Sequence, residues 1–323
     1  MREMSECEVR EVDHAQLDVS VVVPLANERE TLEELYSQIA AVLAQEERCF
    51  EVIFVDDGSA DGSWEVIRRL HAAHENVRGI RFRRNFRKAA ALAAGFAHAR
   101  GAIVVTIDAD LQDDPGSIVT LLRKIAEGND LVSGWKQDRK DPFTKRIASR
   151  LFNFVCSRLT EVQLHDFNCG LKAYRRSVVE TLNLYGDLHR FIPALAAQRG
   201  SRIAEVAVPH FPRRYGKSHY GGARLLEGIF DLFTVCFLSR YLTRPAHVFG
   251  VFAVLAGLLS GTAALMPVVG PASLARPASV WVVGSTLLLA FAGIFLSIGL
   301  LAELLTRLLH DRSASFVIAE TLD

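Results

Sequence analysis

In the first 240 residues, short apolar runs alternate with segments in which apolar residues recur at helical spacing. The run over 20–24 is rich in valine, and leucine and isoleucine recur every three or four positions over 32–43. Asn27 is expected to cap this helix. The order returns with an apolar run over 51–55 and a helical pattern from about residue 62. The chain therefore begins with two strand–helix units.

The alternation continues with a helix over 88–99, a strand over 102–107, a helix from Asp114 and a short strand near 131–133. Pro115 is expected in the first helical position, where its missing N–H costs little. Strands that alternate with helices predict an α/β, Rossmann-like domain with a mostly parallel sheet.

The pattern is less regular in the next part of the chain. Helices are expected over 144–159 and 190–198, and the amphipathic segment 224–241 is expected to lie along a membrane interface.

Two apolar runs, 245–275 and 277–302, contain no Asp, Glu, Lys or Arg. Each exceeds the roughly 20 residues that span a bilayer, so two transmembrane helices are expected. The alternative is a pair of buried core helices, but these would need a larger surrounding protein.

The charges beside the runs indicate their orientation. Arg240 and Arg244 precede the first run, Arg307 and Arg312 follow the second, and the hairpin holds Arg276. The positive-inside rule then places the catalytic domain and both termini in the cytoplasm of a multi-pass inner-membrane protein. The expected parts are a flexible tail (1–16), a cytoplasmic domain (17–223), a juxtamembrane helix (224–243), a transmembrane hairpin (244–308) and a cytoplasmic tail (309–323).

Charge and cysteine usage narrow the class of protein. The formal net charge of the 323 residues is zero, which argues against an extended nucleic-acid surface. The five cysteines form no C-x-x-C pair, as expected of a reduced, cytosol-facing domain. The scattered histidines are interpreted as ordinary surface or loop residues.

Acidic residues follow two of the expected strands. Asp56 and Asp57 follow the run over 51–55, and Asp108 and Asp110 follow the strand over 102–107. Strand residues two apart share a side, so Asp108 and Asp110 can converge on one Mg²⁺ or Mn²⁺ ion, to which Gln112 could add an oxygen. The alternative is that Asp110, Asp113 and Asp114 only cap the next helix.

Three segments carry a resemblance to a known family: Val23–Glu28, Val55–Gly62 and Asp108–Gln112. In this order they resemble the leading motifs of glycosyltransferase family 2, whose fold is GT-A. The resemblance implies that the base and ribose of a nucleotide-sugar donor are held by Pro24, Asn27, Glu28 and Asp57, next to Asp56 and Asp108. It also implies a metal on the diphosphate, held by Asp110 and Gln112. Lys88 is a further expected donor contact, in a segment where Arg87 replaces the family's glycine.

Two later segments, Asp166–Lys172 and Arg213–Tyr220, resemble motifs of the subgroup that glycosylates polyprenyl phosphates. This subgroup includes dolichol-phosphate mannose synthases and bacterial undecaprenyl-phosphate glucosyltransferases. His219 replaces a lysine that is usual there. The resemblance implies that Lys136, Lys145 and Ser149 contact the phosphate of the lipid acceptor.

The basic side chains near these motifs support an anionic acceptor, because Arg and Lys bind phosphate oxygens well. These side chains form two sets in the sequence, of which the first includes Lys136 and Lys145 and the second includes Arg213. Part of the first set could equally be a solvated helix face. An acceptor phosphate is already an anion, so no protein base is needed, and direct displacement would invert the anomeric configuration. Asp166 is assigned a role in positioning the sugar.

UDP-glucose is the donor expected from the resemblance. One alternative is a processive polysaccharide synthase, but the chain lacks a Q-x-x-R-W motif. Another is a non-catalytic anchor of the same fold, which the intact acidic cluster argues against. A homo-oligomer and a downstream flippase remain possible partners.

Overall fold

The computed structural model describes residues 17–137, 153, 156–158, 160, 162–182, 184, 186, 188–212, 245–269, 277–309 and 318–322. The chain divides into two compact units, Met1–Leu232 with Ala314–Asp323, and Phe233–Ser313. The first unit contains both ends of the chain, because the last residues return to it after the second unit.

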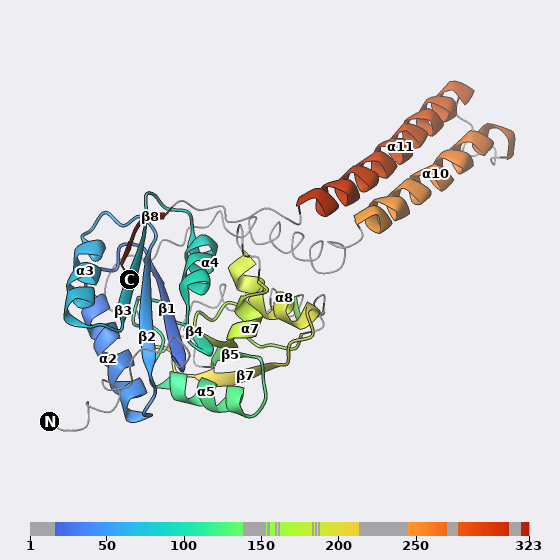
Figure 1. Ribbon diagram of the computed structural model, residues 1–323. Coiled ribbons are helices and arrows are strands. Elements are labelled where there is room, and N and C mark those ends of the chain that lie inside the picture. Colours follow the sequence, from blue (N-terminus) through green and yellow to red (C-terminus); the bar gives the residue numbers. More distant parts are fainter. Residues whose placement is uncertain are drawn as a thin grey trace. The chain divides into compact units, whose positions relative to one another are not determined.

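An eight-stranded sheet forms the centre of the first unit, in the order β7-β5-β6-β4-β1-β2-β3-β8 (Figure 1). β6 is antiparallel to β4 and β5, and β8 is antiparallel to β3. The other pairs are parallel, which confirms the mostly parallel sheet. The strands are β1 (Val19–Leu25), β2 (Phe50–Asp56), β3 (Val77–Phe82), β4 (Ile103–Thr106), β5 (Leu131–Lys136), β6 (Lys172–Arg175), β7 (Ile203–Val208) and β8 (Ile318–Leu322).

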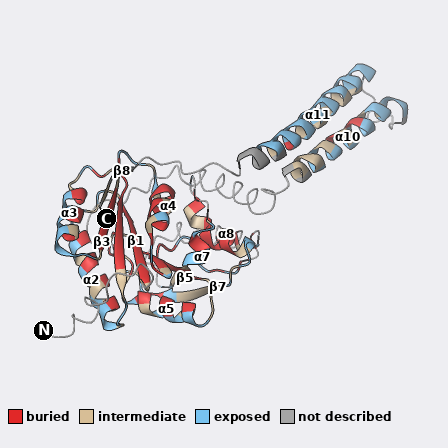
Figure 2. Ribbon diagram, viewed as in Figure 1, coloured by how far each residue is buried: buried red, intermediate tan, exposed pale blue. Residues whose placement is uncertain are grey.

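Helices cover both faces of the sheet, so the central strands are buried on both sides (Figure 2). Val21 and Val23 of β1 pack in the cluster with α2, α3 and α5, and Val22 packs in the cluster with α4, α7 and α8. Burial on both faces explains the continuous apolar runs over 21–23 in β1 and 52–55 in β2. The helices are α2 (Leu32–Gln45), α3 (Ser63–Ala73), α4 (Lys88–His98), α5 (Ser117–Ala126), α7 (Arg176–Val179) and α8 (Ile192–Gln198), with a 3₁₀ turn η1 (Leu188–Phe191) before α8.

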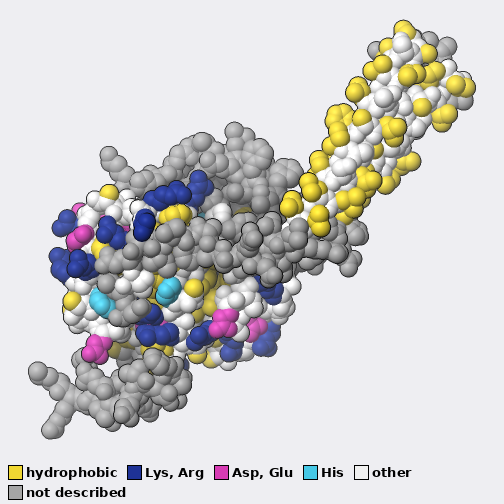
Figure 3. Space-filling model, turned by 45° about the horizontal axis from the view of Figure 1, so that its top comes forward, with side chains coloured by type: hydrophobic (Ala, Val, Ile, Leu, Met, Phe, Trp, Pro, Cys, Tyr) yellow, Lys and Arg dark blue, Asp and Glu magenta, His cyan; other side chains and the backbone are white. Residues whose placement is uncertain are grey.

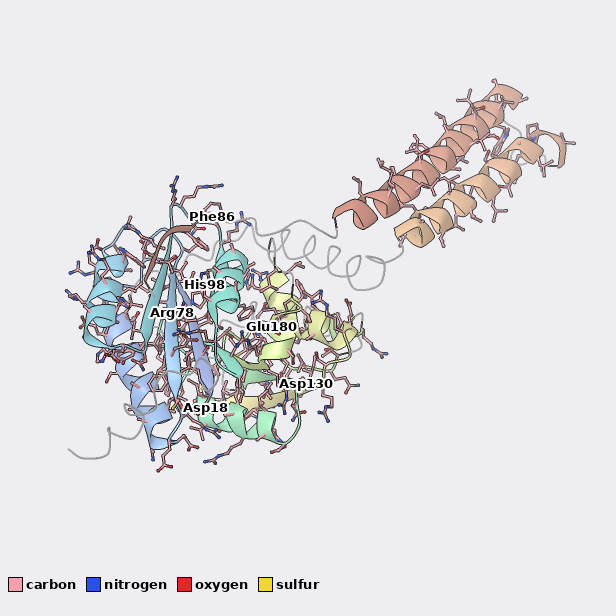
Figure 4. All side chains as sticks on the ribbon, viewed as in Figure 1. Asp18, Arg78, Phe86, His98, Asp130 and Glu180 are labelled. Carbon is pink, nitrogen blue, oxygen red and sulfur yellow. The ribbon has the colours of Figure 1, made fainter. Side chains whose placement is uncertain are left out.

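The two ends of the sheet differ in what they carry. Asp18 and Asp130 precede β1 and β5 and lie at one end, whereas Phe86, which follows β3, lies at the other (Figure 4). The loops after β1, β2, β3 and β4 all leave the carboxyl end. Ligands of open α/β sheets bind at this end, so the candidate site is sought there.

Two helix starts differ from the sequence-based expectation. Thr31, not Asn27, precedes α2, since Asn27 has a φ of 58° that a helix cannot continue. α5 begins at Ser117, and Pro115 lies in the turn before it, closed by the hydrogen bond from the Ser117 N–H to the Asp114 carbonyl (3.0 Å). The expected helix over 144–159 lies largely outside the described residues, and the segment 224–241 lies wholly outside them.

The second unit contains two long helices, α10 (Pro245–Val269) and α11 (Ala278–Leu309). Their apolar parts, Val248–Val268 and Ala278–Ala302, are long enough to cross a membrane. Of the most apolar 18 residues, only 11% are buried in the first helix and 6% in the second. Hydrophobic side chains dominate the visible surface of the pair (Figure 3). This exposure argues against buried core helices. The helices also pair through the Ser260 hydroxyl, which donates to the Ser285 carbonyl (2.8 Å).

Candidate active site

The loops after β1 and β2 are joined by hydrogen bonds that involve Asn27. Its side-chain oxygen accepts the N–H of Ala60 (2.9 Å), and its own N–H is donated to the Ser59 hydroxyl (2.8 Å). The N–H of Glu28 is donated to the Ser63 hydroxyl (3.1 Å). Asn27 therefore holds the wall of the site together. Pro24, in the same expected donor set, is buried inside β1 beside Val55.

Asp56, the last residue of β2, and Asp57, directly after it, are two buried carboxylates with different surroundings. Asp56 accepts the N–H of Ser59 (2.8 Å) and lies 3.9 Å from the Arg81 guanidinium, and burial raises its pKa. Asp57 accepts the N–H of Phe86 (2.6 Å). Burial raises the pKa of Asp57 from 3.8 to about 6, although the Phe86 and Arg87 amides oppose the shift. Asp57 thus anchors the β3–α4 loop to the site.

Asp108 and Asp110 lie in the loop after β4, beyond the end of the strand at Thr106. Both are half-buried, while Ala109 between them is only 3% exposed. The Lys88 ammonium, at the start of α4, lies 2.5 Å from Oδ1 of Asp108. Asp108 is thus already paired with a cation from the protein.

Gln112 connects this acidic loop to the end of β7. Its side-chain nitrogen donates to the Phe211 carbonyl (3.3 Å), and its own carbonyl accepts the Phe211 N–H (2.9 Å). The N–H of Gln112 is donated to Oδ1 of Asp110 (3.2 Å), and Leu111 has a φ of 56°. The loop is therefore held tightly, and Gln112 is positioned next to Asp110.

Gly170 packs directly against the Asp108 carboxylate. A methyl group on Gly170 would lie 2.4 Å from Oδ2 of Asp108, far inside van der Waals contact. The Gly170 carbonyl accepts the Thr106 hydroxyl (2.8 Å), which fixes the glycine against β4. The backbone of the 166–170 loop thus forms one side of the acidic site.

Lys172 lies behind this loop and is 3% exposed. Its ammonium donates to the carbonyls of Phe167 and Cys169, and burial lowers its pKa. Such a buried amine holds the loop by hydrogen bonds.

Asp166 is buried at the start of the same loop, where its side chain accepts the N–H of Asn168 (3.0 Å). Glu205 of β7 accepts the backbone N–H groups of His165 and Asp166 (both 3.0 Å). His165 also stacks on Trp135, with ring centroids 4.1 Å apart. The loop is therefore supported from β5 and β7.

Lys136 has a partner that the sequence analysis missed. Its ammonium lies 2.7 Å from Oδ1 of the buried Asp113, and His210 Nδ1 lies 3.7 Å from the same oxygen. Burial alone would raise the pKa of Asp113, but His210 and Lys136 outweigh it and lower the pKa. Asp113 and His210 come from segments that only the β7 pairing brings together, and no sequence signal links them. His210 therefore lies beside a buried carboxylate, and the expectation that it is an ordinary surface or loop residue is wrong.

Lys145, Ser149 and Arg213, the remaining expected acceptor contacts, lie outside the described residues. Asp114 was expected to cap the next helix, but its side chain accepts the Gly116 N–H (3.1 Å) in the turn before α5, and α5 has no side-chain cap bond. Within the described part of the chain, no three His, Cys, Asp or Glu side chains come together in a metal-binding group. Asp108 and Asp110 offer two carboxylates, and a ligand's phosphates would have to complete any metal shell.

A doubly covered parallel sheet with paired carboxylates beyond its carboxyl edge is typical of enzymes that bind nucleotides. Residues 20–182 match the family model "Glycosyl transferase family 2". The chain belongs to glycosyltransferase family 2 and has its GT-A fold.

Curated relatives match almost the whole chain. The dodecaprenyl-phosphate galacturonate synthase of Rhizobium johnstonii is 36% identical over 320 residues, covering 95% of this chain and 94% of the relative. An undecaprenyl-phosphate 4-deoxy-4-formamido-L-arabinose transferase of Pseudomonas aeruginosa is 38% identical over 304 residues, covering 91% and 86%. The expected resemblance to transferases that use polyprenyl phosphates is confirmed.

Solved structures of glucosyl-3-phosphoglycerate synthase from Mycobacterium tuberculosis share the fold. A complex with phosphoglyceric acid has a TM-score of 0.55 and 23% identity, covering 68% of this chain and 80% of that one. A complex of that enzyme with Mn²⁺, UDP-glucose and phosphoglyceric acid has a TM-score of 0.54 and 23% identity, covering 68% and 79%.

Proposed function

We propose that this enzyme transfers a sugar from a nucleoside diphosphate to a polyprenyl phosphate at a membrane surface. The observation that carries the proposal is the ion pair between Lys88 and Asp108 (2.5 Å) at the carboxyl edge of the sheet, the edge at which Asp57 and Asp110 also lie. Relatives named for polyprenyl-phosphate substrates match the chain over nearly its full length, which supports the choice of acceptor.

The nucleotide part of the donor is assigned to the wall formed by the loops after β1 and β2. Asp57 would accept a hydrogen bond from the base or ribose, and the exposed Asn27 and the half-buried Glu28 would line the same part of the donor site. Lys88 is near enough to Asp108 to place one positive charge beside the donor's diphosphate. That charge would also stabilise the departing nucleoside diphosphate.

The oxygen donors at the end of β4 fit a hard divalent cation, Mg²⁺ or Mn²⁺. Asp110 would hold it, with the side-chain oxygen of Gln112 as a neutral ligand. When bound, such an ion neutralises charge on a diphosphate leaving group. The half-buried positions of both residues, on a loop fixed to Phe211, support this assignment.

The acceptor phosphate needs no protein base, because it is an anion near neutral pH. The protein would bring its oxygen in line with the anomeric carbon, and the product would have the inverted configuration. Lys145, Ser149 and Arg213 stay the predicted phosphate contacts. Lys136, at the end of β5 and held by Asp113, belongs to the same predicted set, and the buried Asp166 would position the sugar.

The chain's connectivity supports a topology in which both ends of the α10–α11 hairpin lie on one side of the membrane. β8 follows the hairpin and yet pairs with β3 in the sheet of the first unit. With the flanking arginines, this favours a cytoplasmic catalytic unit and cytoplasmic termini.

The test is transfer of radiolabelled sugar to undecaprenyl phosphate by the purified full chain in detergent, with Mg²⁺, Mn²⁺ or EDTA. The donor panel contains UDP-glucose, our predicted donor, with nucleotide-activated galacturonate and 4-deoxy-4-formamido-L-arabinose, the sugars named in its relatives. We expect that label is transferred to the lipid only when a metal ion is present, and that each lipid product carries one added sugar.

The same assay separates the alternatives. A polymeric product would indicate a processive synthase. Donor binding without product from any donor would indicate a non-catalytic anchor.

A further inference from the structure

The segment Arg83–Arg87, here the arginine loop, joins β3 to α4 at the same end of the sheet as the acidic site. Arg83, Arg84 and Arg87 are exposed. Nitrogen-tipped side chains project outward from the end of the molecule where Phe86 lies (Figure 4). Exposed positive charge is thus concentrated on one short loop beside the site.

The main chain of the arginine loop is held in place by contacts with Asp57 and Gly58, which follow β2. Asp57 accepts the N–H of Phe86 at 2.6 Å. A methyl group on Gly58 would lie 2.6 Å from the carbonyl carbon of Arg84, so the loop crosses Gly58 in direct backbone contact. The loop therefore presents its charges from a fixed backbone, and ordering it on a ligand would cost little entropy.

The loop combines charge with aromatic surface. The guanidinium carbon of Arg84 lies 4.4 Å from the ring centroid of Phe86, and that ring is half-buried. Cationic and aromatic side chains together suit the headgroup region of a bilayer, where apolar surface and phosphate charge meet.

The connectivity brings the chain from α11 to this same edge. β8 begins at Ile318, which pairs with Phe82, the residue immediately before the arginine loop. Only residues 310–317 separate α11 from β8. A segment that leaves an apolar, membrane-length helix thus rejoins the sheet next to the loop.

We propose that the arginine loop is a docking surface for anionic phospholipid headgroups. It would hold the site's edge on the bilayer, where a polyprenyl phosphate presents its own phosphate. The proposal rests on the membrane attachment in the proposed function, but not on the transfer reaction. Attraction between guanidinium groups and an anionic surface is screened by salt, so the docking is salt-sensitive.

The test compares the full chain in nanodiscs of phosphatidylcholine alone and in nanodiscs that also contain phosphatidylglycerol. Hydrogen–deuterium exchange is followed in the peptide that covers 82–88. Slower exchange of this peptide is expected with phosphatidylglycerol, and high salt should remove the difference. Because each basic side chain near an anionic surface changes affinity roughly fivefold, the double variant Arg83→Glu/Arg84→Glu should lose the protection.

The matched control is Arg68→Glu/Arg199→Glu, two charge reversals at exposed positions outside the loop, which should keep the protection. Unchanged exchange over 51–57 in both variants shows that the sheet remains folded. Equal exchange in both kinds of nanodisc, or protection that survives Arg83→Glu/Arg84→Glu, overturns the proposal.

Two further arms distinguish other anions. In phosphatidylcholine nanodiscs, protection by UDP that Arg83→Glu/Arg84→Glu abolishes would assign the arginines of the loop to the donor, and the same result with stoichiometric undecaprenyl phosphate would assign them to the acceptor site. Either result overturns docking to bulk lipid. The exchange measurement does not require sugar transfer. The docking proposal and the proposed function can therefore be contradicted independently of each other.

Discussion

Gly170 and Asp108 are in such close contact that a methyl group on the glycine would lie 2.4 Å from Oδ2 of the carboxylate. Asp108 also bonds the Lys88 ammonium through its other oxygen, Oδ1. The carboxylate is thus held between a backbone and a cation, and its direction depends on both.

Gly170→Ala is expected to displace Asp108 and to lower sugar transfer by about a hundredfold, because small displacements of positioning groups are costly. The comparison is Gly116→Ala, whose added methyl group would lie 3.1 Å from the movable carboxylate of Asp114. That variant should keep near-normal transfer. Equal transfer by both variants would show that the Gly170 contact does not set the site.

Lys88→Met is expected to weaken donor binding by roughly 10- to 100-fold, the effect of losing one hydrogen bond to a charged group. Binding of UDP, measured by calorimetry in detergent, checks it. Lys124→Met is the matched control, since Lys124 pairs with Glu127 (2.6 Å) on the exposed end of α5. Unaltered UDP affinity in Lys88→Met would remove Lys88 from the donor site.

Asp110→Ala is expected to abolish metal-dependent transfer while the protein stays folded. The reason is that a hard cation loses its anionic protein ligand. Mn²⁺ binding, followed by electron paramagnetic resonance with UDP present, should be lost as well. Asp114→Ala, which removes a turn-capping carboxylate, should retain both. Near-normal turnover of Asp110→Ala would contradict the metal assignment.

The raised pKa of Asp57 predicts that the stability of the folded protein depends on pH. Its folded pKa of about 6 lies above the ordinary value of 3.8, so the folded protein binds this proton more tightly than the unfolded chain. Stability from this group is therefore present below pH about 4 and is lost as the pH rises to about 6. Asp57→Asn should remove this part of the slope and should unfold at a higher temperature at pH 7, but bind UDP more weakly. A thermal-unfolding series from pH 4 to pH 7 measures the first effect, and an unchanged slope would contradict it.

Glu51 lies at the opposite end of the sheet and is 1% exposed. It accepts bonds from the Ser20 hydroxyl (2.6 Å), Arg78 (3.1 Å) and the N–H of Arg100 (2.8 Å). Burial alone would raise its pKa, but these groups lower it below the ordinary 4.5. Its stabilisation is complete above that value and decreases as the pH falls through the lowered pKa.

Glu51→Ala leaves the Arg78 guanidinium buried without this carboxylate, at a cost of about 3–5 kcal/mol in free energy of unfolding. Urea titration of tryptophan fluorescence measures the loss. Glu75→Ala, at an exposed position, should change the free energy by less than about 0.5 kcal/mol. Similar values for both variants would mean that the cluster around Glu51 does not stabilise the sheet.

Local pattern alone determined a large part of this protein. The valine-rich β1 follows from burial on both sides, and the helical spacing of α2 follows from burial on one side. The stretches without Asp, Glu, Lys or Arg over 245–269 and 278–302 in α10 and α11 have the length and composition expected of helices in lipid. The acidic pairs after β2 and β4 were predictable because parallel strands bring their carboxyl ends to one edge. Such features depend on neighbours in sequence, where periodicity carries the information.

Tertiary structure decided the contacts between distant segments. Gly170 meets Asp108, and Lys136 pairs with Asp113, because antiparallel β6 lies between β4 and β5. Asn27 became a link between two loops instead of a helix cap, and β8 returned from beyond α11 to pair with β3. Which strand edge a segment joins is set by long-range pairing and packing, and no local periodicity records that choice.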